Sequence, residues 1–273
     1  LSRRNRIPIL AIGPLLARAG EAEVPILGGD KIGPRPVNLH VNALKALGAE
    51  ITVTKDSYKA VAKDGLKGAS IDLQFPSVGA TENIILAAVL AKGETTVNNA
   101  AIEPEVIDLI KMLQNMGAVI DLGANRTIKI TGVEKLKGVT HSIISDRNEA
   151  VSFACLAVAT DGDILVKDAR QNDLSTFLDA LKKIGGGYEI VDEGIRFYKE
   201  KELSSIEIET GPHPKFMTDW QQPFTVLLTQ AQGNSIIHET IYEDRFGYTN
   251  DLNQMGADIK TSSECLGGLD CRF

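Results

Sequence analysis

The chain has 273 residues, of which 43% are hydrophobic and 24% are charged, proportions that are ordinary for a folded globular protein. Its length suffices for two domains with sizeable cores. A formal net charge of −7 argues against broad nucleic-acid binding, which needs a basic surface. A local cluster of arginines would still bind an anionic small molecule.

The N-terminal segment pairs a basic stretch with an apolar one. Arg3, Arg4 and Arg6 precede the apolar residues Ile7–Ala17, as in a signal peptide. The same apolar helical pattern recurs three times downstream, and no apolar run reaches the roughly 18 residues that a membrane span needs. We therefore predict a core helix and no membrane partner. Because Leu1 begins within this pattern, we expect the chain to be a piece of something longer.

The segment Gly28–Pro36 contains three glycines and two prolines, so it cannot form a helix or a regular strand. It predicts an irregular loop that brings backbone N–H groups close to a ligand. The Arg35 guanidinium is a planar fork that suits phosphate or carboxylate. Asp30 is a candidate acid beside a bound anion. The alternative is a surface turn with solvated charges.

A helix end, a glycine and a strand recur at roughly 70-residue intervals, which predicts internal structural repeats. The four copies are Leu44–Ile51, Met112–Ile120, Leu181–Ile190 and Leu252–Ile259.

An apolar helix that leads into a strand recurs with the same period. Helices that are apolar on nearly every face are buried on all sides, and amphipathic helices such as Glu105–Met116 would cover them. This pattern predicts an α/β class with inside-out, barrel-type units, and no GxGxxG or GxxxxGK[ST] fingerprint points to a nucleotide fold. The four copies are Ile9–Gly20 into Glu23–Ile26, Thr81–Gly93 into Thr95–Asn98, Glu149–Gly162 into Asp163–Lys167, and Phe224–Gly233 into Ser235–Glu239.

Polar loops precede all four of these helices: Arg6–Pro8, Ser77–Ala80, Ser145–Glu149 and His213–Asp219. Equivalent positions in repeats fall on one rim, where helix N-termini would form an anion site. The alternative for Ser77, Asp146 and Asp219, taken singly, is helix capping.

The three cysteines indicate neither a zinc site nor a disulfide framework. Cys155 lies in an apolar helical run and is predicted to be buried, and Cys265 and Cys271 have no histidine nearby in the sequence. A reducing cytoplasm is the expected location, and no metal is expected.

Several motifs together resemble the bacterial UDP-N-acetylglucosamine 1-carboxyvinyltransferases, a family of enolpyruvyl transferases. They are Gly28–His40, Ser77–Thr81, Asn99–Glu105, Asp146–Glu149, Pro212–Asp219 and Glu243–Phe246.

The resemblance runs from about Arg6 to about Ile259 and covers only the central part of that family's chain. It implies two domains of three similar units each, with the active site between them, of which residues 1–145 and 146–273 would be portions. The second portion would be incomplete at its C-terminal end. We therefore expect the chain to be inactive or nearly so by itself.

The activity that the resemblance implies is transfer of enolpyruvyl from phosphoenolpyruvate to the 3-hydroxyl of UDP-N-acetylglucosamine. This is the first committed step of peptidoglycan synthesis, a cytoplasmic reaction tied to cell-wall biogenesis, cell shape and cell division. It needs no metal or organic cofactor, because protein groups supply an acid, a base and cationic stabilisation of phosphate.

The same resemblance assigns residues. Asp30 would deliver the proton to phosphoenolpyruvate C3, at a position where many members carry the cysteine that reacts with the epoxide antibiotic fosfomycin. Asp219 would be the base at the sugar hydroxyl, and Arg35 would bind phosphate. Glu103, Arg147 and Arg245 would organise the cleft. The substrate-binding set would be Arg6, Arg35, Pro36, Val37, Asn38, Leu39, Ser77, Val78, Gly79, Asp219 and Ile241.

Two positions depart from the family pattern: Asn38 replaces a more usual aspartate, and Phe75 replaces a basic residue. Other functions stay open. One is the related shikimate-pathway enolpyruvyl transferase, and another is a non-catalytic module that binds sugar nucleotide or a partner. A generic α/β scaffold is the third.

Overall fold

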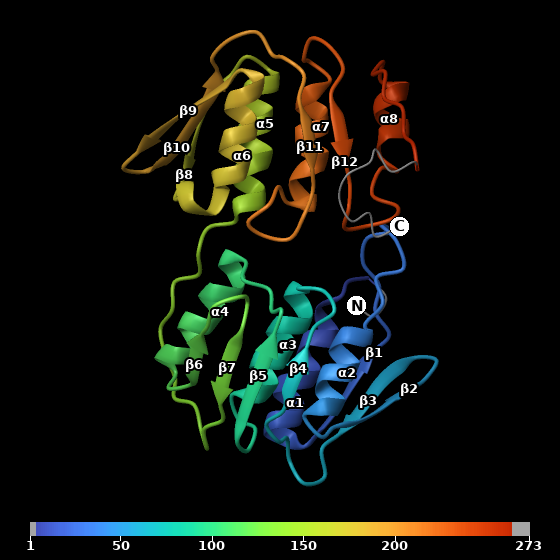
Figure 1. The fold of residues 1–273 in the computed structure, drawn as a ribbon, viewed down its shortest axis with the longest axis vertical. Coiled ribbons are helices and arrows are strands. Elements are labelled where there is room, and N and C mark those ends of the chain that lie inside the picture. The colour runs from blue at the N-terminus through green and yellow to red at the C-terminus, as the bar shows by residue number, and fades with distance from the viewer. Residues whose placement is uncertain (1–3, 264–273) are drawn as a thin grey trace. The chain divides into compact units, whose positions relative to one another are not determined.

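The computed structural model describes residues 4–263 (Figure 1). They divide into two compact units. The first comprises residues 4–30 and 35–143, and the second comprises residues 31–34 and 144–263. Within the described residues, no helix combines the length and the apolar character that crossing a membrane requires.

The first unit holds two successive helix-and-sheet repeats. One antiparallel sheet has the order β1-β3-β2, and the other has the order β4-β5-β7-β6, in which only β4 and β5 are parallel. The elements are η1 (Ile7–Ala11), α1 (Ile12–Ala19), β1 (Glu21–Pro25), α2 (Asn38–Ala46), β2 (Glu50–Val53), β3 (Ser57–Val61), β4 (Ser70–Asp72), α3 (Val78–Ala88), β5 (Glu94–Asn98), α4 (Pro104–Asn115), β6 (Val119–Leu122) and β7 (Ile128–Thr131).

The second unit repeats this order of helices and strands. Strands β8-β10-β9 form an antiparallel sheet, and β11 pairs with β12 in parallel, as β4 pairs with β5. The elements are α5 (Arg147–Ala159), β8 (Asp163–Lys167), α6 (Gln171–Ile184), β9 (Gly186–Val191), β10 (Gly194–Lys199), β11 (Glu207–Glu209), η2 (Thr218–Trp220), α7 (Gln221–Leu228), β12 (Ile236–His238) and α8 (Thr249–Gln254).

The repeat predicted from the glycines is confirmed. A left-handed glycine follows each of α2, α4, α6 and α8, with φ between 97° and 108°. A glycine adopts this conformation without the Cβ clash that other residues meet, so it ends the helix and redirects the chain. The four glycines are Gly48, Gly117, Gly185 and Gly256.

The fourth predicted strand is wrong. Residues 257–263, which follow Gly256, form no strand. The side chain of Asn253 takes the place of a pairing strand at Ile259, because its Nδ2 donates to the Ile259 carbonyl and its Oδ1 accepts from the Ile259 N–H, both at 2.8 Å.

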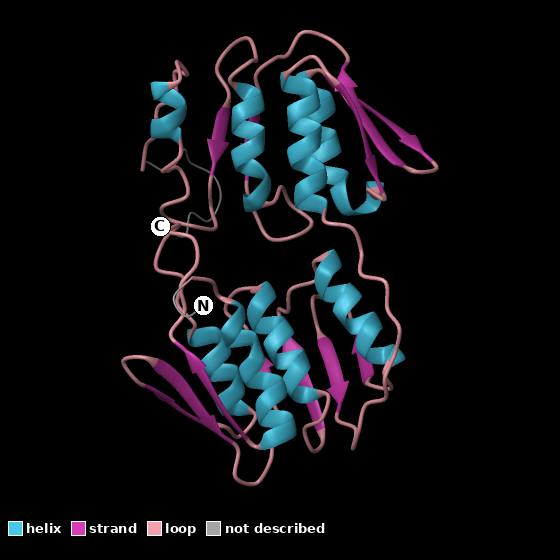
Figure 2. Ribbon diagram, turned by 180° about the vertical axis from the view of Figure 1, so that it is seen from behind, coloured by secondary structure: helices cyan, strands magenta, loops and turns pink. Residues whose placement is uncertain are grey.

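The prediction of helices buried on all sides holds best for α3, where Ile84 and Ile85 are fully buried. It is wrong for α5 and α7, which pack against each other but leave Phe153, Leu156 and Val226 between 43% and 50% exposed. Figure 2 shows α5, α6 and α7 side by side in this unit. Within the described residues, the three side chains are therefore only partly covered.

Cys155 is buried in the core of the second unit, as predicted, and its burial raises the pKa of the thiol. Cys265 and Cys271 lie outside the described residues. Trp220 and Phe177 are also fully buried there, with ring centroids 6.0 Å apart. This aromatic core fixes the start of α7.

Candidate functional site

The loop between β1 and α2 is irregular, and it holds Arg35 in an unusual conformation. Arg35 has a φ of +46° although prolines flank it on both sides. A left-handed conformation costs a non-glycine residue roughly 1–2 kcal/mol, and such strained residues are enriched at ligand-binding sites. Its Nη1 donates to the Asp30 carbonyl oxygen at 3.4 Å, while Asp30 itself is exposed.

Two predicted ligand-binding arginines meet at Gly29. This glycine has a φ of +112°, and a Cβ there would lie 3.0 Å from Arg6 Cγ and 3.4 Å from Arg35 Nη1. The absence of a side chain therefore lets both arginines pass across the loop. Two guanidinium-bearing side chains thus come together in the first unit, which favours an anionic ligand.

The predicted residues after Arg35 lead directly into α2, whose first residue is Asn38. Pro36 and Asn38 are exposed, whereas Val37 and Leu39 pack against the core of the first unit. The backbone of this segment is therefore anchored on one side and open on the other.

The N-terminus of α3 carries the predicted Ser77–Gly79 segment. Ser77 caps the helix, since its Oγ accepts from the Ala80 N–H at 3.3 Å, which confirms the capping role. The first N–H groups of a helix have no intrahelical partner, and they point outward from the positive end of its dipole. The N–H groups of Val78 and Gly79 are in this position, as an anion site requires.

His40 and Asn83 join these segments, and the sequence predicted no role in the site for either residue. The buried His40 ring lies against Gly79, where a Cβ would be 3.2 Å from His40 Cε1. Asn83 Nδ2 donates to the Ile9 carbonyl at 3.1 Å and lies 3.3 Å from His40 Nδ1. Burial, and then the charge of Arg6, lower the pKa of His40 to about 4. His40 is therefore neutral near pH 7.

In the second unit, Asp219 lies in η2 and pairs with Arg245. Arg245 Nη2 is 2.5 Å from Asp219 Oδ1. The Arg245 side chain is 8% exposed and that of Asp219 is 42% exposed, so the carboxylate is oriented yet open to solvent. The capping alternative is wrong for Asp219, because the turn continues into α7 and the carboxylate bonds to a guanidinium instead.

The start of α5 meets the start of α7 in the same unit. Asp146 caps α5 through the N–H groups of Asn148 and Glu149, which confirms its capping role. Asn148 Oδ1 accepts from Trp220 Nε1 at 3.0 Å, and the buried Arg147 guanidinium lies 5.4 Å from the Trp220 ring centroid. These contacts hold two of the predicted loops together.

The segment that carries Ile241 is tied to a buried carboxylate. Glu239 Oε1 accepts from the N–H groups of Ile241 at 2.8 Å and Tyr242 at 3.2 Å. Ile241 itself is half-buried. Arg245 also lies over the Tyr242 ring, with its guanidinium carbon 5.4 Å from the ring centroid.

Glu103 is buried at the start of α4 in the first unit. The charge of Glu103 affects the ionisation of Glu82 in α3. Burial raises the pKa of Glu82 to about 7, and the charges of Glu105 and then Glu103 add to this effect.

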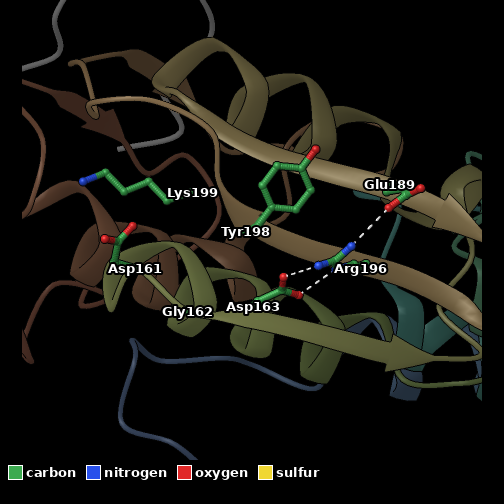
Figure 3. Close-up of a pocket in the computed structure, with 7 residues that line it drawn as sticks. All are labelled: Asp161, Gly162, Asp163, Glu189, Arg196, Tyr198 and Lys199. Carbon is green, nitrogen blue, oxygen red and sulfur yellow. Dashed lines mark hydrogen bonds and ion pairs between the residues drawn. The ribbon is translucent and has the colours of Figure 1, made fainter.

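A hollow of about 400 Å³ lies beside β8 and β10. Figure 3 shows the residues that line it, and none of them is a predicted site residue. The arginine of this hollow already forms two ion pairs. Arg196 Nη2 lies 2.5 Å from Asp163 Oδ2, and Arg196 Nη1 lies 3.5 Å from Glu189 Oε2. Among residues 4–263, no group of three or more His, Cys, Asp or Glu side chains could hold a metal ion.

Comparison with protein families identifies the chain's relatives. The family model described as EPSP synthase (3-phosphoshikimate 1-carboxyvinyltransferase) matches residues 2–269. The chain belongs to this family. The resemblance and the α/β enolpyruvyl-transferase fold predicted from the sequence are thus confirmed.

Curated relatives resemble the chain along nearly all of its length. It is 49% identical to the UDP-N-acetylglucosamine 1-carboxyvinyltransferase of Protochlamydia amoebophila, with 100% of this chain and 60% of the relative covered. The enzyme of the same name from Chlamydia muridarum is 51% identical, with coverages of 98% and 61%. The chain thus spans about three fifths of the length of these relatives.

Solved structures share the fold. The enolpyruvyl transferase NikO from Streptomyces tendae has a TM-score of 0.80 and 22% identity, with 93% of this chain and 61% of that chain covered. An EPSP synthase from Acinetobacter baumannii has a TM-score of 0.65 and 22% identity, with coverages of 89% and 58%.

Proposed function

We propose that the protein carrying this chain transfers the enolpyruvyl group of phosphoenolpyruvate to the 3-hydroxyl of UDP-N-acetylglucosamine. The observation that carries this proposal is the identity of about half of all residues to relatives that bear this activity in their name. The EPSP synthase structures, at 22% identity, support the fold alone.

The first unit supports the proposal through groups that suit an anionic ligand. Arg6 and Arg35 meet at Gly29, and the Ser77–Gly79 turn supplies helix N–H groups. Both substrates carry phosphate groups, which bind well to guanidinium forks and to helix N-termini. Pro36–Leu39 would line the uridine, with the exposed Asn38 amide hydrogen-bonding the uracil edge.

The reaction needs an acid and a base on different carboxylates. Asp30 would donate a proton to C3 of phosphoenolpyruvate while Asp219 accepts the proton of the attacking sugar hydroxyl. The sugar oxygen bonds to C2 to give a tetrahedral ketal. From C2 the ketal then loses phosphate, whose charge Arg35 would stabilise, and from C3 it loses a proton, which the Asp30 carboxylate would take back, so that the C2–C3 double bond forms again. Arg245 supports this role of Asp219, since it orients the carboxylate while leaving it exposed.

The remaining residues would shape the site. Ile241 would pack on the uracil, while Glu103 and Arg147, both buried, would organise the surrounding helix starts. In this proposal the reaction opens peptidoglycan synthesis in the cytoplasm, without a metal or an organic cofactor, and so serves cell shape and division.

Calorimetric titration tests the choice of substrate. We expect heat of binding with UDP-N-acetylglucosamine and none with shikimate 3-phosphate. Binding of shikimate 3-phosphate alone would favour the shikimate-pathway reaction. Binding of UDP-N-acetylglucosamine without turnover of phosphoenolpyruvate, in a protein completed to the length of its relatives, would leave a sugar-nucleotide-binding module.

A further inference from the structure

Glu239 bridges two functional segments of the second unit. It directly follows β12, and its side chain is buried, with 7% of its surface exposed. Oε2 accepts from Thr218 Oγ1 at 2.9 Å, and Oε1 accepts from the N–H groups of Ile241 and Tyr242. One carboxylate therefore joins the turn that contains Asp219 to the segment that contains Ile241.

The surroundings make this bridge rigid. Thr218 is itself buried, and the Glu239 carboxylate accepts three hydrogen bonds away from water, where such contacts are stronger than in solvent. On the other side of the segment, the Thr240 N–H donates to Thr210 Oγ1 at 2.9 Å, and Thr240 Oγ1 donates to the Thr210 carbonyl at 2.8 Å. The backbone around Ile241 is thus anchored twice.

A second path closes the connection into a ring. Asp219 forms an ion pair with Arg245, and the Arg245 guanidinium lies over the Tyr242 ring. The Tyr242 N–H in turn donates to Glu239. The ring places the carboxylate of Asp219 and the backbone of the Ile241 segment at a fixed separation.

We propose that Glu239 is a positioning residue that sets the proposed base, Asp219, and the proposed uracil contact, Ile241, in register with one sugar-nucleotide molecule. This inference rests on the proposed function. A side chain of this length is required, because aspartate is one methylene shorter and cannot reach Thr218 and the two N–H groups together. Catalysis is sensitive to such placement, since an error of about 1 Å can cost roughly 100-fold in rate.

Variants distinguish the two arms of the bridge, which are the contact of Glu239 with Thr218 and its contacts with the N–H groups of Ile241 and Tyr242. Thr218→Val removes only the hydroxyl contact, whereas Thr218→Ser keeps it. Glu239→Asp weakens both arms, and Glu207→Gln, which neutralises an exposed carboxylate on β11, is the matched control. Steady-state kinetics would be measured on a protein completed to the length of its relatives, with UDP-N-acetylglucosamine as the varied substrate.

We expect Thr218→Val to lower kcat by about 10- to 100-fold with little change in KM, because only the Asp219 arm is released. Glu239→Asp should lower kcat similarly and also raise KM for the sugar nucleotide about tenfold. Thr218→Ser and Glu207→Gln should match the parent. Variants that lose thermal stability but keep kcat and KM would overturn the positioning role.

Amide hydrogen exchange on the 273-residue chain gives a readout that does not require turnover. Glu239→Asp should speed exchange at Ile241 and Tyr242 by at least about tenfold, while Thr218→Val should leave both unchanged. Equal exchange in Glu239→Asp and the parent would overturn the bridge itself. Absence of turnover with UDP-N-acetylglucosamine, combined with the expected exchange result, would instead refute the proposed function and keep the bridge.

Discussion

The carboxyl group of Glu82 makes the stability of the first unit depend on pH. Burial raises its pKa from 4.5 to about 7 in the folded protein. Between pH 4.5 and 7 the folded state retains a proton that the unfolded state has lost, so stability falls as pH rises through this window. The loss is absent below pH 4.5 and complete above pH 7.

The size of the effect follows from the shift. One pKa unit corresponds to about 1.4 kcal/mol, so ionising Glu82 in place costs on the order of 3 kcal/mol at pH 8. Glutamine cannot ionise, and it has nearly the same shape. Glu82→Gln should therefore leave stability near pH 4.5 almost unchanged and raise the free energy of unfolding by up to about 3 kcal/mol at pH 8.

Urea titrations at pH 5 and pH 8 would measure this difference. Far-UV circular dichroism follows both units, whereas the fluorescence of Trp220, the only tryptophan, reports the second unit alone. The variant should shift the circular-dichroism transition and leave the fluorescence transition in place. The exposed Glu21→Gln is the control. Identical pH dependence in parent and Glu82→Gln would refute the argument.

Other variants test the proposed site, each in a protein completed to the length of its relatives. Asp219→Asn should lower turnover by about 10²- to 10⁴-fold and spare sugar-nucleotide binding by calorimetry, and unchanged turnover would remove Asp219 as the base. The parent should resist covalent inactivation by fosfomycin, because Asp30 is a weak nucleophile toward an epoxide; mass spectrometry would detect an adduct. Asp30→Cys should become sensitive to fosfomycin and stay partly active. Asp30→Asn should lose most of its rate. Full activity in Asp30→Asn would favour the alternative that Gly28–Pro36 is a surface turn with solvated charges. Gly29→Ala should weaken UDP-N-acetylglucosamine binding by about tenfold, or 1.4 kcal/mol, because alanine is strained at a φ of +112° and its Cβ would press on Arg6 and Arg35. Parental affinity would contradict the joint role of the two arginines.

Local rules allowed much of the fold to be predicted. A glycine that ends a helix is a short-range signal, so Gly48, Gly117 and Gly185 marked real boundaries. The same signal failed after Gly256, because a strand also needs a partner, and Asn253 satisfies Ile259 instead.

The burial of helices was harder to predict, since it depends on what packs against each face. The apolar composition of α5 resembles that of α3, yet Phe153 is 47% exposed in the structure, whereas Ile85 is fully buried. Composition describes the helix and does not describe its neighbours.

The site residues could be assigned by motif, but their partners could not. Asp219 and Arg245 lie 26 residues apart, and His40 and Asn83 lie 43 residues apart. Only the folded chain brings such pairs together. Asn83 carries a sequence signal, because it is a polar residue that directly precedes the apolar run Ile84–Ala88 of α3 and needs a partner when buried.

Product analysis tests enolpyruvyl transfer most directly. A protein completed to the length of its relatives would be incubated with phosphoenolpyruvate and either UDP-N-acetylglucosamine or shikimate 3-phosphate, and its products would be identified by mass spectrometry. We predict the enolpyruvyl ether of UDP-N-acetylglucosamine and one equivalent of inorganic phosphate. Formation of an enolpyruvyl product only with shikimate 3-phosphate would contradict the proposed function. So would the absence of any enolpyruvyl product with both acceptors.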